Sequence, residues 1–271
     1  MYINNGILEI DDSIIDIYNQ GDIHGNLYAT TNKIKQYDIH NALFILCGDC
    51  GFGFERLGYY KDLVLPKLTK VLKKYNCRII YLRGNHDDPN YFNGKTINTK
   101  YVCAVPDYTI VKCMNKNILC VGGGISIDRE WRKYQDLKRL EQYSFYHKCT
   151  IEEAKKQMPL SYWEDEQVKY QLKTNEHIDI ICSHSSPSFC YPFTKGDIVL
   201  RYAENDETLL QDIKIERTTL DKIYDDYKDT ITHWYYGHYH SSMMQMINGC
   251  MFRLLDIEEI CRHVSDDNNF E

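Results

Sequence analysis

Five short apolar runs, each followed at once by a polar cluster, constrain the fold of this chain more than any other feature. The runs are rich in β-branched and aromatic residues, the clusters contain Gly, Asp or His, and the runs span residues 14–18, 42–47, 78–82, 178–182 and 232–236. Such runs are typical of buried strands, and the clusters mark where strands end and loops begin. The pattern predicts five strands that present five polar loops.

Two segments between the first three runs have the spacing of amphipathic helices. They span residues 27–37 and 62–75, and they complete the strand, helix, strand alternation that is typical of an α/β sheet. Ligands of such sheets collect beyond the carboxyl ends of the strands. We therefore expect the functional residues to lie in the polar clusters.

Further elements are predicted towards the C-terminus. Residues 108–114 and 118–121 form a hairpin across 115–117, and residues 243–247 and 250–255 form another across Asn248-Gly249, a strong type I′ turn signal. Residues 206–227 have helical spacing, residues 131–173 form an aromatic-rich, largely helical insertion, and residues 265–271 look like a frayed end. Because no stretch resembles a linker between domains, we predict one domain over residues 1–271.

Net charge and cysteine usage exclude several classes of function. The formal net charge of −7 argues against tight electrostatic binding to nucleic acid or to an anionic membrane. No apolar segment approaches the roughly 20 residues needed to span a bilayer, so we expect no membrane partner. Most of the 11 cysteines lie within apolar runs. We interpret them as small buried hydrophobic residues of a cytoplasmic protein.

The polar clusters carry residue types that bind metal ions. Asp22 and His24 stand two apart after the first run, so both side chains can face one pocket. Asp49 follows Gly48 after the second run, and its carboxylate has enough lone pairs to bridge two cations. Asn85 follows the third run and offers a carboxamide oxygen. Taken singly, each of these residues is explained as well by an ordinary turn or surface position.

The joint pattern favours a metal site. Five of the ten histidines fall in these clusters, and His184, His238 and His240 complete a set of carboxylate, carboxamide and imidazole donors without a thiolate. These donors suit Mn²⁺, Fe or Zn²⁺ better than Cu(I), and a bridging carboxylate implies two ions. Paired ions about 3.5–4 Å apart stabilise both the attacking and the leaving oxygen when a group at phosphorus is displaced. The sequence therefore predicts two divalent cations, with Mn²⁺ as the first choice.

The same series resembles the calcineurin-like metallophosphoesterase superfamily in order and spacing. The matching motifs, within residues 14–256, are Asp22-Ile23-His24, Gly48-Asp49, Gly84-Asn85-His86-Asp87, His184 and Gly237-His238-Tyr239-His240. The resemblance implies an α/β/β/α sandwich with the dinuclear site at the strand ends. It implies that one metal is held by Asp22, His24 and His240, and the other by Asn85, His184 and His238. It also implies that Asp49 bridges them and that His86 faces the phosphate and assists the leaving group.

The chain departs from the phosphoprotein phosphatase branch of this superfamily. That branch carries Gly-Asp-x-x-Asp-Arg-Gly, whereas residues 48–55 read Gly-Asp-Cys-Gly-Phe-Gly-Phe-Glu and lack the phosphate-binding arginine. This argues against activity on phosphoproteins. Residues 122–132 and 162–166 are similar to a less characterised bacterial and phage branch. Arg129 and Arg132 are candidates for a bidentate grip on phosphate, or else solvated charges at the start of the insertion.

Three functions stay open. The leading one is hydrolysis of a small phosphorylated substrate, a nucleotide among the candidates, by a hydroxide that bridges two divalent cations, with His86 assisting the leaving group. The alternatives are a nuclease, for which the tyrosine-rich composition leaves room, and a scaffold without chemistry, although no metal-binding position is missing. We further expect the insertion at residues 131–173 either to cover the site, with Tyr162 and Trp163 on the substrate, or to pack on the sandwich.

Overall fold

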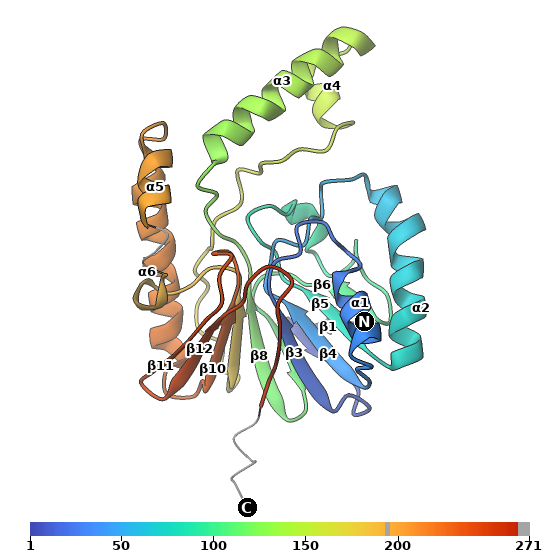
Figure 1. The fold of residues 1–271 in the computed structure, drawn as a ribbon, viewed down its shortest axis with the longest axis vertical. Helices are drawn as coiled ribbons and strands as arrows, with labels where there is room; N and C mark the ends of the chain where they lie inside the picture. The colour runs from blue at the N-terminus through green and yellow to red at the C-terminus, as the bar shows by residue number, and fades with distance from the viewer. Residues whose placement is uncertain (193–195, 265–271) are drawn as a thin grey trace, which may run out of the picture.

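Two β-sheets pack face to face between outer helices in the computed structural model, which describes residues 1–192 and 196–264 (Figure 1). Among these residues the smaller sheet has five strands, in the order β13 (Ile260–Arg262), β3 (Asp16–Gln20), β4 (Ala42–Leu46), β5 (Arg78–Tyr81) and β6 (Val102–Ala104). The larger has eight, in the order β1 (Ile3–Asn4), β2 (Ile7–Glu9), β7 (Thr109–Cys113), β8 (Lys116–Val121), β9 (Ile180–Ser183), β10 (His233–Tyr236), β12 (Cys250–Leu254) and β11 (Met243–Ile247). The expected α/β/β/α sandwich is confirmed.

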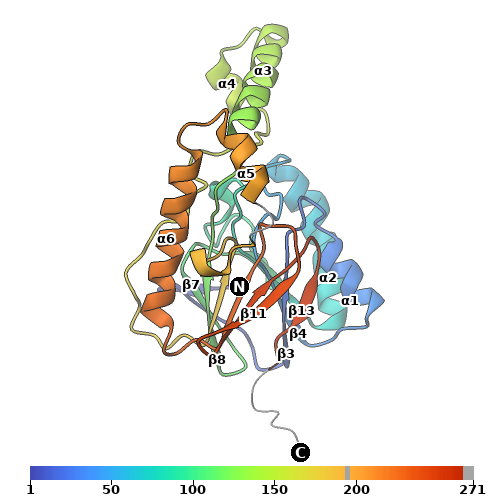
Figure 2. The same cartoon turned by 60° about the vertical axis from the view of Figure 1, so that its left-hand side comes forward.

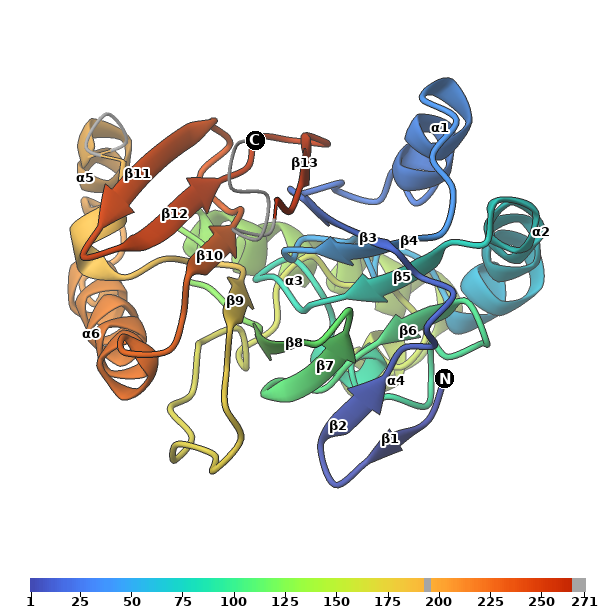
Figure 3. The ribbon, with the colours of Figure 1, turned by 90° about the horizontal axis from the view of Figure 1, so that it is seen from below.

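The first half of the chain forms the predicted parallel sheet. β3, β4, β5 and β6 pair in parallel, and α1 (Ala29–Gln36) and α2 (Leu65–Tyr75) connect the first three of these strands. A π-helical turn, η1 (Tyr59–Val64), leads into α2. Leu68 and Leu72 of α2 are buried in one cluster with Phe44 of β4. Both helices therefore cover the outer face of the smaller sheet, as Figure 3 shows.

The core between the sheets follows from the alternation of side chains along each strand. Phe44 and Leu46 of β4 belong to the helix-facing cluster, while Leu43 and Ile45 belong to the cluster between the sheets. A parallel strand covered on both faces is expected to be apolar throughout, and all of β4 is buried. All 11 cysteines are free thiols, and nine of them are buried, which confirms the prediction that most are small core residues.

The two hairpins differ in how well their turns are predicted. Asn248 and Gly249 form the predicted two-residue turn, with φ of 50° and 80°, between β11 and β12. In the other hairpin Lys116 already pairs with Cys113. The turn is therefore made by Met114 and Asn115, at φ of 51° and 58°, and the predicted loop at 115–117 is wrong because two polar residues join the strand.

The second half adds helices at one end of the sandwich and on its outer face. α3 (Arg129–His147) and α4 (Ile151–Lys155) project away from the sheets (Figures 1 and 2), while α6 (Leu209–Tyr227) covers the larger sheet. α5 (Gly196–Ala203) was not predicted. The insertion is helical only as far as Lys155, and residues 156–179 return to β9 without helix or strand. The predicted frayed end at 265–271 lies outside the described residues.

No helix in residues 1–192 or 196–264 is both long and apolar enough to cross a membrane.

Candidate metal centre

The polar loops after β3, β4, β5, β9 and β10 meet at one end of the two sheets. β3 to β5 run parallel to one another, as do β9 and β10, so the loops at their carboxyl ends leave each sheet at one edge. These loops carry all seven predicted metal ligands, which the fold gathers in one place: Asp22, His24, Asp49, Asn85, His184, His238 and His240.

Asp22, His24 and His240 form the first group of donors. His24 Nε2 lies 2.9 Å from His240 Nε2, and His240 Nε2 lies 3.3 Å from Asp22 Oδ2. One donor atom from each of these three residues and from Asp49 lies within 4.8 Å of all the others. Two carboxylates and two imidazoles at this spacing suit one divalent cation of borderline hardness.

Asn85, His184 and His238 form the second group. His184 Nε2 lies 2.7 Å from Asn85 Oδ1 and 3.2 Å from His238 Nδ1. Asp49 contacts both groups, since its Oδ1 lies 3.3 Å from His184 Nε2 and its Oδ2 lies 3.8 Å from His24 Nδ1. One carboxylate thus directs one oxygen to each group, which is the arrangement that a bridging ligand requires.

The backbone at this end adopts a conformation that side-chain-bearing residues rarely take. Four of the seven candidate ligands have positive φ, in the left-handed region: His24 (42°), Asp49 (44°), His238 (70°) and His240 (46°). Each residue in this conformation costs about 1–3 kcal/mol of backbone strain, and strained residues cluster at functional sites. The backbone conformation of these loops is therefore determined by the directions that the candidate ligands take, at a cost in backbone strain.

Glycines allow the carboxylates to approach the neighbouring loops. A Cβ atom on Gly84 would lie 2.1 Å from Asp49 Oδ1, and one on Gly237 would lie 2.2 Å from Asp22 Oδ1. No side chain fits at either position without displacing a candidate ligand. The two glycines are required by close packing, which explains why each directly precedes a donor residue.

Asp87 fixes the loops after β4 and β5 relative to each other. Its carboxylate accepts backbone N–H hydrogen bonds from Gly51 at 2.7 Å, Gly84 at 2.8 Å, Phe52 at 2.9 Å and Cys50 at 3.0 Å. Asp49 and Asn85 are thereby held on one rigid support. Asp87 belongs to the quoted motif, but no local pattern around it indicates this role.

The electrostatics of the centre are dominated by imidazoles around a buried carboxylate. Burial alone would raise the pKa of Asp49, but the surrounding imidazoles outweigh it and lower that pKa: His86, His184 and His24. Burial also lowers the pKa of His238 well below its usual value. An ionised Asp49 and a neutral His238 are the protonation states that cation binding needs, and a set of carboxylate, carboxamide and imidazole donors fits two divalent ions.

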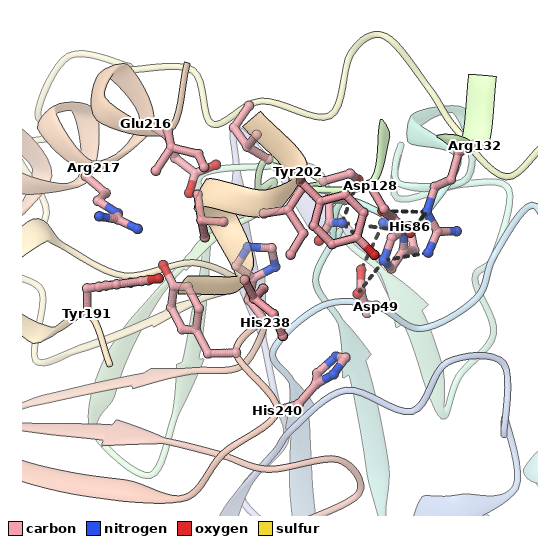
Figure 4. Close-up of a pocket in the computed structure, with 18 residues that line it drawn as sticks. Asp49, His86, Asp128, Arg132, Tyr191, Tyr202, Glu216, Arg217, His238 and His240 are labelled. Carbon is pink, nitrogen blue, oxygen red and sulfur yellow. Dashed lines mark hydrogen bonds and ion pairs between the residues drawn. The ribbon is translucent and has the colours of Figure 1, made fainter. Parts of the chain in front are cut away.

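His86 and Arg132 lie beside the two groups and face the same space (Figure 4). His86 Nε2 is 3.8 Å from Asp49 Oδ2 and 3.3 Å from a terminal nitrogen of Arg132. Asp128 accepts hydrogen bonds from Arg132 Nε at 2.8 and 2.9 Å. The predicted position of His86 next to the donors, but outside both groups, fits this geometry.

Arg129 does not lie in this space, and its prediction as a phosphate ligand is wrong. Arg129 as a residue is 5% exposed. Its guanidinium donates hydrogen bonds to Asp206, Asp212 and Thr208 at the start of α6. Two carboxylates therefore occupy its donors. Arg129 instead ties α3 to α6, and only Arg132 keeps a donor near His86.

The aromatic residues of the insertion pack rather than face the centre. The indole of Trp163 lies so close to Gly53 that a Cβ atom there would be 2.6 Å from its Cζ2. The ring of Tyr162 lies under the ammonium of Lys133, at 4.9 Å. Neither lines the cavity beside the donors, so the structure supports packing for both and a site contact only for Arg132.

A cavity of about 260 Å³ opens beside the donors and includes Asp49, Asn85, His86, His238 and His240 in its wall. Ser126, Asp128, Glu216 and other residues of the wall were not predicted. Ser126 and Asp128 lie in the stretch 122–132 quoted above, which assigned them no role, and Glu216 comes from α6, far along the chain.

The calcineurin-like phosphoesterase family model matches residues 15–242. Similar proteins include the serine/threonine-protein phosphatase 6 catalytic subunits of Drosophila melanogaster, 31% identical over 120 residues, and of Caenorhabditis elegans, 29% identical over 122 residues. These alignments cover 39% and 40% of this chain, and the chain spans 38% and 36% of those relatives' length.

Two solved structures align over most of the chain at low similarity. Phosphopantetheinyl hydrolase from Mycobacterium tuberculosis aligns with a TM-score of 0.38 and 10% identity, covering 94% of this chain and 99% of that one. A protein serine/threonine phosphatase from Saccharomyces cerevisiae aligns with a TM-score of 0.32 and 14% identity, covering 92% and 70%. Because the family model covers most of the chain and includes every predicted ligand, the chain belongs to the calcineurin-like phosphoesterase family.

Proposed function

We propose that the protein hydrolyses esters of a small phosphorylated substrate with two bound divalent cations, Mn²⁺ being the first choice over Fe or Zn²⁺. One observation carries this proposal: Asp49 directs one carboxylate oxygen towards Asp22, His24 and His240, and the other towards Asn85, His184 and His238. When bound, two such ions supply an activated water and neutralise charge on the phosphoryl oxygens.

The chain's own residues provide the remaining chemistry. A guanidinium can only donate hydrogen bonds, so Arg132 donates to His86 Nε2 where these atoms are 3.3 Å apart. A phosphate bound between them would take over that donor and leave His86 facing the departing oxygen. Burial is the main cause that lowers the pKa of His86. His86 is therefore a neutral hydrogen-bond donor to the leaving group rather than a permanent cation.

Two alternatives find less support. A nuclease needs a basic track that leads away from the metal centre. Among the described residues, Arg132 and Arg217 are the only lysines or arginines in the cavity wall. The protein phosphatase 6 subunits are relatives over only part of their length. This chain also lacks the arginine of the Gly-Asp-x-x-Asp-Arg-Gly motif.

The proposed activity is tested with chromogenic esters. Metal-stripped protein is supplied with Mn²⁺ and assayed on p-nitrophenyl phosphate and on bis(p-nitrophenyl) phosphate, followed by a panel of phosphorylated metabolites and a phosphopeptide. We expect metal-dependent hydrolysis, and the preferred ester identifies a monoesterase or a diesterase. Absence of hydrolysis of either ester by protein that carries two metals per chain would favour the scaffold.

A buried carboxyl group supports the second group of donors through a serine hydroxyl. Asn85 Nδ2 donates to Ser126 Oγ at 2.7 Å, and Ser126 Oγ donates to Glu166 Oε2 at 2.6 Å. Because the amide nitrogen of Asn85 is held by Ser126, its oxygen faces the donor group.

Substituting Ser126→Ala or Glu166→Ala is therefore expected to weaken binding of the second metal about 10–100-fold, as loss of a supporting contact typically does. Calorimetric metal titration measures this, and the exposed residue Glu164 on the same segment supplies the control Glu164→Ala. If both variants bind two metals with unchanged affinity, these contacts do not position Asn85.

Metal binding should weaken at acid pH. Burial would lower the pKa of His184, but Asp49 and Asp22 outweigh it and raise that pKa; a hydrogen bond to Asp22 raises the pKa of His240. A raised pKa keeps these imidazoles protonated to higher pH in the metal-free protein. Metal affinity is therefore lost as the pH falls through the raised pKa, starting above about 6.5. The acid limb of activity should move to lower pH when Mn²⁺ is raised. An acid limb whose position does not change with Mn²⁺ concentration would refute this prediction.

A further inference from the structure

The cavity beside the metal centre has a second polar end that the proposed chemistry does not use. Asp49, His86 and Arg132 line it at the metal side, while Glu216 and Arg217 of α6 line the far side (Figure 4). A phosphate held at the metal side would point its organic group towards α6. The cavity is therefore where the rest of the substrate lies.

The wall between the two ends is apolar. It is made by side chains of the loop before α3, of α5 and of α6: Ile125, Ile127, Ile198, Val199, Tyr202 and Ile213. Ile198 and Tyr202 are 47% and 41% exposed, so a bound group would remove apolar surface from water, which is favourable. A phosphate ion touches none of this wall. A sugar would place hydroxyl groups against it, and a phosphoserine side chain is too short to cover it.

The far end can recognise a polar edge. The Arg217 guanidinium lies over the ring of Tyr191, with its carbon 3.6 Å from the ring centre, so the group is held flat with in-plane N–H donors. Glu216 is 4% exposed and is held by Ser185 Oγ at 2.5 Å. A fixed donor and a fixed carboxylate side by side suit a flat ligand whose edge carries both acceptor and donor atoms.

Size limits the ligand further. The cavity volume of about 260 Å³ is slightly below the range of about 300–1,000 Å³ that is usual for drug-sized ligands. One heteroaromatic ring system on a short linker fits, whereas a chain of several nucleotides does not. We infer that this cavity holds the base of a mononucleotide, with its phosphate at the metal centre and its polar edge at Glu216 and Arg217. This inference rests on the proposed phosphoesterase function.

Two assays test the inference separately from the chemistry. Hydrolysis of nucleoside 5′-monophosphates is compared with that of ribose 5-phosphate, which lacks the base, and binding of the four free nucleosides to the metal-loaded protein is measured by calorimetry. We expect kcat/KM to favour at least one nucleotide over ribose 5-phosphate by about tenfold or more, the discrimination that a small apolar group gives in such a pocket. Arg217→Gln should reduce both this preference and nucleoside binding.

Lys214→Gln is the matched control, because Lys214 lies exposed on the same helix outside the cavity wall. Hydrolysis of ribose 5-phosphate as fast as every nucleotide would overturn the base-binding inference and leave the phosphoesterase function intact. Nucleoside binding without hydrolysis of any ester would overturn the function and leave the cavity assignment intact. If Arg217→Gln folds with its normal melting temperature and keeps both binding and preference, the far end is not a recognition site.

Discussion

Asp49→Asn is expected to abolish ester hydrolysis and to remove at least one metal from the protein. The substitution removes a negative charge that contacts both donor groups, at 3.3 Å from His184 Nε2 and 3.8 Å from His24 Nδ1. A single carboxamide oxygen cannot replace two anionic oxygens. Metal-based stabilisation supplies several kcal/mol, so kcat should fall by about 10³-fold or more. Elemental analysis and steady-state kinetics on the same samples measure both effects.

Glu55→Gln is the control for Asp49→Asn. Glu55 is exposed on the loop that follows Asp49, so the control makes the same change of charge without touching the donors. It should keep its metals and its rate. If Asp49→Asn retained two metals per chain at unchanged affinity, the bridging role would be wrong, whatever its effect on the rate.

His86→Asn is expected to keep both metals and to lose about 10²–10⁴-fold in turnover, the usual contribution of a positioned proton or hydrogen-bond donor. Asn85 already supplies the donor of this loop, since its Oδ1 lies 2.7 Å from His184 Nε2. The loss should be larger for esters with poor leaving groups, because these need the most help to depart. Rates on a series of substituted phenyl phosphates measure this.

The control is His40→Asn, which replaces an exposed imidazole paired with Asp38 and distant from the donors in the fold. It should leave rate and metal content unchanged. If His86→Asn loses metal in parallel with activity, His86 is itself a ligand. If its loss is the same for all leaving groups, it acts elsewhere in the reaction.

The sequence predicted which side chains gather at one end of the sheets because the relevant signals are local. An apolar run that ends in a polar cluster marks both a strand and the loop that carries the chemistry, and Asp22, Asp49 and Asn85 each follow such a run directly. Parallel pairing then brings loops from distant parts of the chain to one edge. The turn at Asn248-Gly249 was predictable for the same reason, since two residues determine its backbone conformation.

The failures concern partners that are distant in sequence. Arg129 has the charge to bind phosphate, but Asp206 and Asp212, which follow about 80 residues later, take its donors. Nothing near Arg129 in the sequence indicates them. For Trp163 the sequence left substrate stacking and packing open, because its contact with Gly53 depends on how the return segment crosses the sandwich. Residue type alone does not say which neighbour a side chain meets.

The central claim is that hydrolysis requires two divalent cations at the seven gathered donors. The most direct test is a Mn²⁺ titration of chelator-treated protein, with bound metal and hydrolysis of p-nitrophenyl phosphate and its diester followed on the same samples. The account predicts no hydrolysis without metal and a rate that rises as the second equivalent binds. Hydrolysis that persists in the metal-free protein, or saturates when only one equivalent is bound, would contradict it.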